Sequence, residues 1–197
     1  MSKKQLELGT RCPQTKMDKI LRKRRERTSL VLMVIRATSC GIVRDNRVLL
    51  IRKAKGQFGA GKWSVLGGKI DDGESIGHAC VREVLEESGL DTYYLKYHGV
   101  LKFRFGNENE TQPDWGVHVF STESFEGQLR ESAEGILCWT EIDEIPYDEM
   151  WPDNRFWLPL LIQGKTFNGE FRFDKEGTRL LKHNLEIHEE PPVTYQS

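Results

Sequence analysis

The sequence predicts a layered α/β or α+β domain made of several strands and two helices. Three observations support this fold class. Short apolar runs bounded by turn residues recur along the chain, and only two segments have helical character. The 197 residues, of which 38% are apolar and 30% charged, are also enough to bury one sizeable core.

The first predicted elements form a β-hairpin. Thr38–Val43 and Arg47–Arg52 are strand-like runs, and Asp45 and Asn46 lie between them as turn residues. A glycine-rich loop, Gly56–Gly61, follows the hairpin, and Trp63–Leu66 is expected to be a short strand.

The next predicted element is a helix over Glu74–Ser88. Its apolar residues recur with a rough period of 3.6, and Gly89 suits the residue that follows a helix. The apolar positions are Ile76, Ala79, Cys80, Val84 and Leu85.

The second half of the chain predicts mainly strands. The strand-like runs are Tyr93–Phe105, Gly116–Thr122, Gly135–Thr140 and Phe167–Phe173. Asp143–Glu149 contains Pro146 and predicts a turn, while Trp157–Ile162 predicts a second helix. The acidic, proline-containing tail His188–Ser197 is expected to be frayed.

Composition excludes several classes of protein. The net charge of −1 argues against a nucleic-acid footprint over the whole domain. The four cysteines are far apart, with no CxxC pair, which argues against a zinc site or a disulfide framework and favours a cytoplasmic protein. The apolar run Leu30–Ile35 is shorter than the roughly 20 residues of a membrane span, so no membrane association is expected.

We expect three regions along the chain. Residues 1–29 form a basic extension that includes Arg22–Arg25, residues 30–187 form the main domain, and residues 188–197 form a tail. The extension is interpreted as a solvated appendage, and binding of nucleic acid or an acidic partner through it remains an alternative. We expect the protein to be a monomer.

Three glutamates in the first helix point to chemistry. Glu83, Glu86 and Glu87 have the spacing i, i+3, i+4, which places them on one face, where like charges repel. A divalent cation would turn this repulsion into attraction, because Mg²⁺ prefers carboxylate oxygens. Arg82 adjoins the cluster, and Glu74 at the helix start can join it.

The spacing of these residues resembles the signature of the Nudix hydrolases, GX5EX7REUXEEXGU, where U is aliphatic. Every fixed position agrees between Gly68 and Leu90. The resemblance implies a mixed β-sheet sandwiched between helices (α/β/α) and hydrolysis of a nucleoside diphosphate derivative with Mg²⁺ or Mn²⁺. It also implies that Glu83, Glu86 and Glu87 bind the metal or act as the base, and that Gly67 is a further ligand. Arg82 and Glu74 would orient the carboxylates.

Three further stretches resemble the MutT-like branch, which hydrolyses oxidised purine nucleoside triphosphates, and its mammalian members most closely. They are Gly59–Lys69, Gly116–Phe120 with Glu131–Glu134, and Ile145–Phe173. By this resemblance Trp151 stacks on the purine, Asp153 binds the base edge, and Thr38 lies at the pocket floor. Further pocket-lining residues would be Phe58, Phe103 and Trp115.

The same resemblance assigns the phosphate end of the site. Lys53 and Lys69 would lie near the phosphates or the sugar, and Glu134 would join the metal site as a distant carboxylate.

Two base-reading positions depart from the mammalian pattern. Ser64 stands where those enzymes have Asn, and Asn154 stands where they have a second Asp. The Asn154 amide is a fixed hydrogen-bond donor, whereas a carboxyl can donate or accept. We therefore expect a different purine selectivity, either narrower or directed to another modified purine.

Other functions remain open at this stage. The chain could hydrolyse an RNA cap, an RNA 5′ end or a dinucleoside polyphosphate, although the region Phe103–Gly106 lacks the Pro and Tyr typical of other branches. A non-catalytic nucleotide sensor is less favoured, since sensors often lose the carboxylates that are intact here.

Overall fold

A mixed β-sheet is the frame of the fold in the computed structural model, which describes residues 34–106, 115–130 and 132–196. The strands in chain order are β1 (Ile35–Arg44), β2 (Arg47–Lys53), β3 (Trp63–Ser64), β4 (Leu90–Tyr93), β5 (Leu95–Phe105), β6 (Trp115–Thr122), β7 (Ser124–Gly127), β8 (Gly135–Glu141), β9 (Thr166–Phe173), β10 (Leu180–His188) and β11 (Val193–Tyr195). The helices are α2 (Ile76–Ser88) and α3 (Asn154–Ile162), with short 3₁₀ turns η1 (Ile142–Glu144) and η2 (Tyr147–Glu149). The predicted basic extension, residues 1–29, lies outside the described residues.

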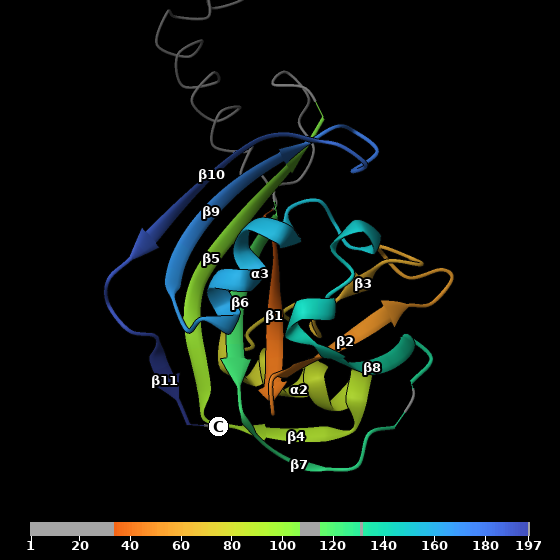
Figure 1. Ribbon diagram of the computed structural model, residues 1–197, viewed down its shortest axis with the longest axis vertical. Helices are drawn as coiled ribbons and strands as arrows, with labels where there is room; N and C mark the ends of the chain where they lie inside the picture. Colours follow the sequence, from red (N-terminus) through yellow and green to blue (C-terminus); the bar gives the residue numbers. More distant parts are fainter. Residues whose placement is uncertain (1–33, 107–114, 131, 197) are drawn as a thin grey trace, which may run out of the picture. The chain divides into compact units, whose positions relative to one another are not determined.

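Within the described residues, nine strands join one sheet with the order β10-β9-β5-β6-β1-β2-β3 (Figure 1). Strand β11 also pairs with β5, and β8 pairs with β2, while β4 and β7 form a separate pair. The β1–β6 and β5–β9 pairs are parallel and the other strand pairs are antiparallel, so the sheet is mixed.

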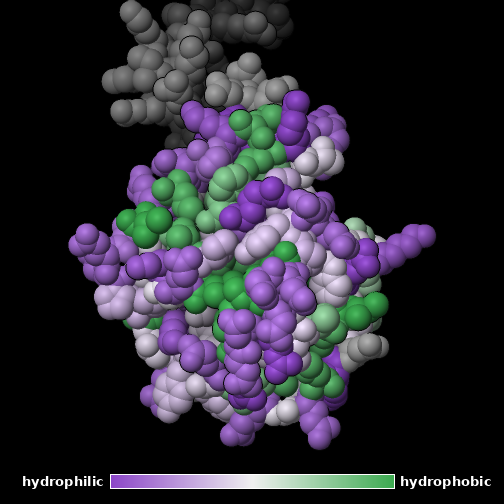
Figure 2. All heavy atoms as spheres, in the orientation of Figure 1, coloured by the Kyte–Doolittle hydropathy of each residue, from purple (hydrophilic) through white to green (hydrophobic). Residues whose placement is uncertain are grey.

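The two helices cover opposite faces of the sheet (Figure 1). Successive side chains of a strand point to opposite faces, so neighbouring residues of one strand pack under different helices. On β6, Phe120 packs in the cluster that contains Cys80 and Val84 of α2. Its neighbour Val119 packs in the other cluster, with Leu158 of α3. The predicted sheet between helices is confirmed. Hydrophilic side chains cover much of the face shown in Figure 2, with hydrophobic patches between them.

No helix in the described residues is long and apolar enough to cross a membrane.

The predicted hairpin and the end of the first helix are confirmed. Asp45 and Asn46 have φ angles of 51° and 60°, as the tight turn between β1 and β2 requires. Gly89 has φ 75° and its N–H donates to the Leu85 carbonyl, which ends α2.

The predicted start of that helix was wrong by two residues. Ser75 caps α2, since its hydroxyl accepts a hydrogen bond from the His78 N–H at 3.2 Å, and the helix begins at Ile76. Glu74 therefore precedes the helix. The second helix begins at Asn154, three residues before its predicted start at Trp157.

The predicted single strand Tyr93–Phe105 is also wrong. Tyr94 has φ 49°, and this left-handed residue separates β4 from β5. Strand β4 pairs with β7, whereas β5 enters the main sheet.

The C-terminal tail is ordered as a strand, contrary to the expectation that it is frayed. Val193–Tyr195 pairs with β5, and the Tyr195 ring lies 5.8 Å from that of Phe120 and 5.9 Å from that of Tyr97, both in T-shaped contacts. The preceding strand β10 pairs with β9 and was not predicted.

A close backbone contact places the segment before α2 against β1. The Thr38 N–H donates to the Gly68 carbonyl at 2.8 Å, and the Cys40 N–H donates to the Leu66 carbonyl at 2.7 Å. Gly67 lies between these contacts with φ 139°, and a Cβ at this position would lie 2.2 Å from the Thr38 carbonyl oxygen. Only glycine fits there without moving β1 or the segment.

We predict that Gly67→Ala lowers the free energy of unfolding by about 2–4 kcal/mol, because strain in φ adds to the overlap with β1. Gly61→Ala is the control, because Gly61 has φ 81° but no atom lies within 4 Å of a Cβ built there. This substitution should lower the free energy of unfolding by only about 1–2 kcal/mol. Urea unfolding measures both. Equal losses in the two variants would contradict the contact with β1 as the cause.

Candidate active site

A cavity of about 500 Å³ lies beside β1 and the start of α3. All ten residues predicted to bind substrate line it: Thr38, Lys53, Phe58, Ser64, Lys69, Phe103, Trp115, Trp151, Asp153 and Asn154. They come from strands, loops and a helix end that are far apart in the sequence. The fold therefore gathers the predicted set around one space.

Aromatic rings form one part of the cavity wall. The Phe58 ring stacks on two tryptophans, with its centroid 5.2 Å from that of Trp115 and 5.3 Å from that of Trp151. The Phe173 ring meets Trp151 edge-on at 6.3 Å, and Phe103 stacks on Phe171 at 5.5 Å. These contacts give a wall suited to flat apolar ring systems.

Asp153 and Asn154 place polar groups in the same cavity. The Asp153 carboxylate is buried and accepts hydrogen bonds from Trp157 Nε1 at 2.7 Å and Asn154 Nδ2 at 3.5 Å. Burial raises the pKa of Asp153 to about 6, although both hydrogen bonds lower it. An ionised carboxylate accepts up to about four hydrogen bonds, so Asp153 retains capacity for a ligand.

Thr38 adds a second polar group to the wall. Thr38 is 2% exposed, and its hydroxyl makes no hydrogen bond with the described residues. An unsatisfied buried hydroxyl costs free energy unless a ligand or water completes it. Ser64, on the short strand β3, also faces this cavity.

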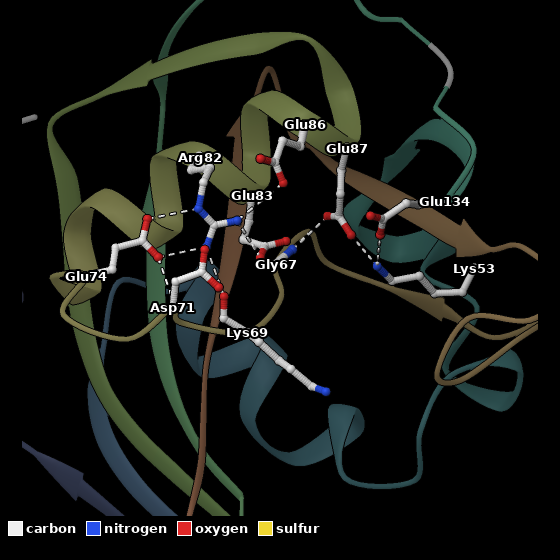
Figure 3. Close-up of polar contacts among 10 residues, drawn as sticks. All are labelled: Lys53, Gly67, Lys69, Asp71, Glu74, Arg82, Glu83, Glu86, Glu87 and Glu134. Atoms are coloured by element: carbon white, nitrogen blue, oxygen red, sulfur yellow. Dashed lines mark hydrogen bonds and ion pairs between the residues drawn. The ribbon is translucent and has the colours of Figure 1, made fainter.

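The carboxylates of α2 lie next to Gly67 (Figure 3). Glu87 is fully buried, and its carboxylate accepts a hydrogen bond from the Gly67 N–H at 2.8 Å. Glu83 packs against Gly68, where a Cβ would lie 2.2 Å from Glu83 Oε2. Glu86 points outward, with 55% of its side chain exposed. Gly68 thus makes room for the Glu83 carboxylate, and the Gly67 N–H binds that of Glu87.

A lysine ammonium group lies between two of the carboxylates (Figure 3). Lys53 Nζ donates to Glu87 Oε1 and lies 3.4 Å from Glu134 Oε2. The pairing of β2 with β8 sets Lys53 opposite Gly135, the residue that follows Glu134. Burial raises the pKa of Glu87 to about 7, while the charge of Lys53 opposes this rise.

Arg82 connects the other acidic residues of the site. Its guanidinium group makes two hydrogen bonds with Glu74, at 2.9 and 2.8 Å, and one with Glu83 at 2.8 Å. It also donates to Glu86 at 3.3 Å and to the Lys69 carbonyl at 3.0 Å. A two-pronged pair of this kind fixes orientation as well as charge.

Within the described residues, no group of three or more His, Cys, Asp or Glu side chains is arranged to hold a metal ion. The donor types still fit a hard divalent cation, because carboxylate oxygens and a backbone carbonyl are the ligands that Mg²⁺ prefers. An ammonium cation already lies between Glu87 and Glu134. The Glu87 and Glu134 carboxylates therefore already bind a cation, and a metal ion would compete with Lys53 for these two carboxylates.

The two lysines predicted near the phosphates have different surroundings. Lys53 contacts the carboxylates, whereas the Lys69 side chain points away from them (Figure 3). The Lys69 ammonium lies 5.9 Å from the centroid of the Trp115 ring. The two lysines thus bring positive charge to the carboxylate side and to the aromatic side of the cavity.

Sequence reasoning missed several cavity residues. Lys62 lies with its ammonium 5.1 Å from the centroid of the Trp151 ring, and Trp157 binds Asp153. Trp157 is the first residue of the predicted second helix and follows Asp153 by four residues. Helical spacing could therefore have identified Trp157 as a partner of Asp153. Lys62 directly follows the glycine-rich loop, but no local pattern indicated its contact with Trp151.

Comparisons with known proteins agree with this geometry. The family model of the NUDIX domain matches residues 33–161. The oxidized purine nucleoside triphosphate hydrolase of Danio rerio is 43% identical over 145 residues, covering 74% of this chain and 90% of the relative. The enzyme of the same name from Mus musculus is 41% identical over 144 residues, covering 73% and 89%.

A solved structure shows the same fold. The crystal structure of a MutT protein from Bacillus halodurans has a TM-score of 0.70 and 26% identity, covering 78% of this chain and 98% of that one. The resemblance stated from the sequence is confirmed, and the chain belongs to the NUDIX family.

Proposed function

We propose that this NUDIX hydrolase cleaves oxidised or otherwise modified purine nucleoside triphosphates, of the 8-oxo-dGTP and 2-hydroxy-dATP type, to the monophosphate and pyrophosphate. Such an activity removes damaged nucleotides before they enter nucleic acid. The main support is the cavity that joins an aromatic wall and a buried Asp153 to the carboxylates beside Lys53. The names of the relatives from Danio rerio and Mus musculus support the same substrate class.

The base end of the cavity has the chemistry that a purine needs. Trp151 supplies a flat surface for stacking, and Phe103 supplies further apolar wall. Asp153 accepts hydrogen bonds from N–H groups of the base edge, while the Asn154 amide both donates and accepts. Thr38 and Ser64 add hydroxyl groups that can complete the recognition of an extra oxygen on the base.

The phosphate end has residues that would hold a divalent cation. The Gly67 carbonyl and the carboxylates of Glu83, Glu86, Glu87 and Glu134 would bind Mg²⁺, or Mn²⁺, whose ligand preferences are similar. The metal would neutralise phosphate charge and lower the pKa of a bound water.

The chain's own residues supply the remaining tasks. Lys53 and Lys69 attract the phosphates, and Arg82 holds Glu83 in place through its hydrogen bond. One of the α2 glutamates accepts a proton from the attacking water, since a carboxylate with a raised pKa is a better base. Burial raises the pKa of both Glu83 and Glu87, so either can serve in this role.

We propose in addition that the protein is cytoplasmic and monomeric. Cys40 and Cys80 are buried free thiols, and Cys138 is an exposed one, which suits a reducing compartment.

The proposed activity is tested by measuring pyrophosphate release with Mg²⁺ from 8-oxo-dGTP, 2-hydroxy-dATP, dGTP, ADP-ribose, diadenosine tetraphosphate and a capped RNA. We expect a preference for a modified purine triphosphate. Glu87→Gln should lower kcat by roughly 10²-fold or more, because it removes a buried charge from the site. The control Glu126→Gln alters an exposed glutamate on β7 and should leave kcat unchanged. Preference for ADP-ribose, the dinucleotide or the cap would contradict the substrate proposal.

The pH dependence of base recognition tests Asp153. With a pKa of about 6, its carboxylate is ionised at pH 7.5 and protonated at pH 5, and only the ionised form is purely an acceptor. We predict that Asp153→Asn weakens dGMP binding about tenfold at pH 7.5 and much less at pH 5, where both side chains are neutral. Calorimetric titrations at both pH values give the ratio of the variant's Kd to that of the wild type. Protonation of the dGMP phosphate affects both proteins alike, so it cancels in this ratio. A ratio that does not change with pH would count against this role.

Selectivity tests the two positions that depart from the mammalian pattern. We predict that Asn154→Asp together with Ser64→Asn changes the kcat/KM ratio between 8-oxo-dGTP and 2-hydroxy-dATP by about tenfold, since one hydrogen bond to a base edge is worth about 1–3 kcal/mol. Asn184→Asp, on the exposed strand β10, is the matched control. An unchanged ratio would show that neither position reads the base.

A further inference from the structure

The turn between β9 and β10, residues 174–179, packs against Trp151 from outside the cavity. None of its residues lines the cavity. Gly177 is buried, whereas its neighbours Glu176 and Thr178 are exposed. A Cβ at Gly177 would lie 3.0 Å from Trp151 Cζ3 and 3.2 Å from Phe105 Cε1. The backbone of this turn therefore limits where the Trp151 indole can lie.

A second loop touches a different part of the same indole. A Cβ at Gly59, in the glycine-rich loop 56–61, would lie 3.1 Å from Trp151 Nε1. Gly177 approaches the six-membered ring instead, where its Cβ would also lie 3.4 Å from Cη2. Both glycines have positive φ, of 78° and 71°, and both backbones pass too close for a larger residue. Two loops far apart in the sequence thus support one tryptophan.

One carboxylate keeps the β9–β10 turn in shape. Asp174 Oδ1 accepts hydrogen bonds from the Arg179 N–H at 3.0 Å and the Thr178 N–H at 2.7 Å, and Oδ2 accepts one from the Thr178 hydroxyl at 2.8 Å. The Gly177 N–H donates to the Asp174 carbonyl at 3.1 Å. The hydrogen bond from Arg179, together with those from Thr178, lowers the pKa of Asp174, so this carboxylate is ionised at neutral pH.

We propose that the β9–β10 turn positions the base platform, and that Asp174 is a positioning residue which acts through Gly177 on Trp151. Asp174 fixes the turn, the turn limits the indole, and the indole carries the base. The inference rests on the proposed function in one respect, the stacking of the base on Trp151. It adds a residue that touches neither the cavity nor the substrate.

The proposal separates the two ends of the ligand. Stacked rings need a particular offset and separation, so an indole that adopts several orientations is competent to bind in only a fraction of the molecules. The observed Kd is the intrinsic Kd divided by that fraction. The partners of Asp174 belong to its own turn and include none of the carboxylates beside Lys53. Loss of Asp174 should therefore weaken ligands with a base and spare ligands without one.

The test uses calorimetric titrations with 8-oxo-dGMP and, as a ligand without a base, with pyrophosphate, both with Mg²⁺ at pH 7.5. We expect Asp174→Ala to raise Kd for 8-oxo-dGMP about three- to tenfold and to leave Kd for pyrophosphate unchanged. Asp174→Asn keeps an acceptor oxygen for the two N–H groups and should restore most of the affinity. Glu176→Ala removes the same charge from the same turn and should change neither Kd.

A matched pair of glycines tests the contact with Trp151. Gly177 and Gly164 have nearly equal φ angles, 71° and 69°, but nothing lies within 4 Å of a Cβ built at Gly164. Alanine therefore brings similar backbone strain to both positions, and only Gly177→Ala pushes on the indole. We expect Gly177→Ala to raise Kd for 8-oxo-dGMP and Gly164→Ala to leave it unchanged.

The indole itself is observed by ¹⁹F NMR of protein labelled with 5-fluorotryptophan. The chain has five tryptophans, and the Trp151 resonance is the one that is missing in a Trp151→Phe variant. In the free protein this resonance should shift or broaden in Asp174→Ala and in Gly177→Ala. It should stay in place in Glu176→Ala and Gly164→Ala, and return in Asp174→Asn.

Several outcomes would overturn the positioning role of the turn. They are a Trp151 resonance that ignores Asp174→Ala and Gly177→Ala, an equal response in the control variants, and a pyrophosphate Kd that rises as much as that of 8-oxo-dGMP. Equal binding of 8-oxo-dGMP by wild type and variants, or no binding by wild type, would do the same.

These measurements need no turnover, so the two proposals can fail separately. Absence of pyrophosphate release from modified purine triphosphates, with weaker 8-oxo-dGMP binding in Asp174→Ala, rejects the proposed function and keeps the role of the turn. Turnover of these triphosphates, with unchanged 8-oxo-dGMP binding in Asp174→Ala, does the reverse.

Discussion

The buried carboxylate of Glu87 is the constraint on which the site depends. A charged group with no exposure is stable only when hydrogen-bonded or paired, and here the Gly67 N–H and the Lys53 ammonium meet that need. The Gly67 N–H reaches Glu87 because residues 66–68 pack directly on β1, which requires glycine at position 67. One glycine thus ties the sheet, the segment before α2 and the acidic face of α2 to one another.

This arrangement sets two chemically different regions side by side. Carboxylates, Arg82 and Lys53 form a charged region whose members hold one another in place. Aromatic rings and the buried Asp153 form the other region, inside the cavity. A nucleotide has the same division, with charged phosphates at one end and a flat base with a polar edge at the other. The fold matches this division because β1 borders both regions, through its contact with Gly68 and through Thr38 in the cavity wall.

Local spacing predicted the elements that depend on local interactions. The three glutamates of α2, its end at Gly89 and the β1–β2 turn follow from spacing and turn residues. The resemblance added residues such as Trp151 and Asp153, which the fold brings to one cavity. Long-range packing could not be predicted. The pairing of the tail with β5, the position of Lys53 between Glu87 and Glu134, and the stacking of Phe58 on Trp115 and Trp151 each join segments that are far apart in the sequence.

The most direct test is a crystal structure with Mg²⁺ and a purine triphosphate analogue that cannot be hydrolysed. The account predicts a cation bound by the α2 glutamates, Lys53 released from Glu87, and the base stacked on Trp151 with its edge on Asp153. A base bound outside this cavity, or Lys53 still on Glu87 with the cation elsewhere, would contradict it.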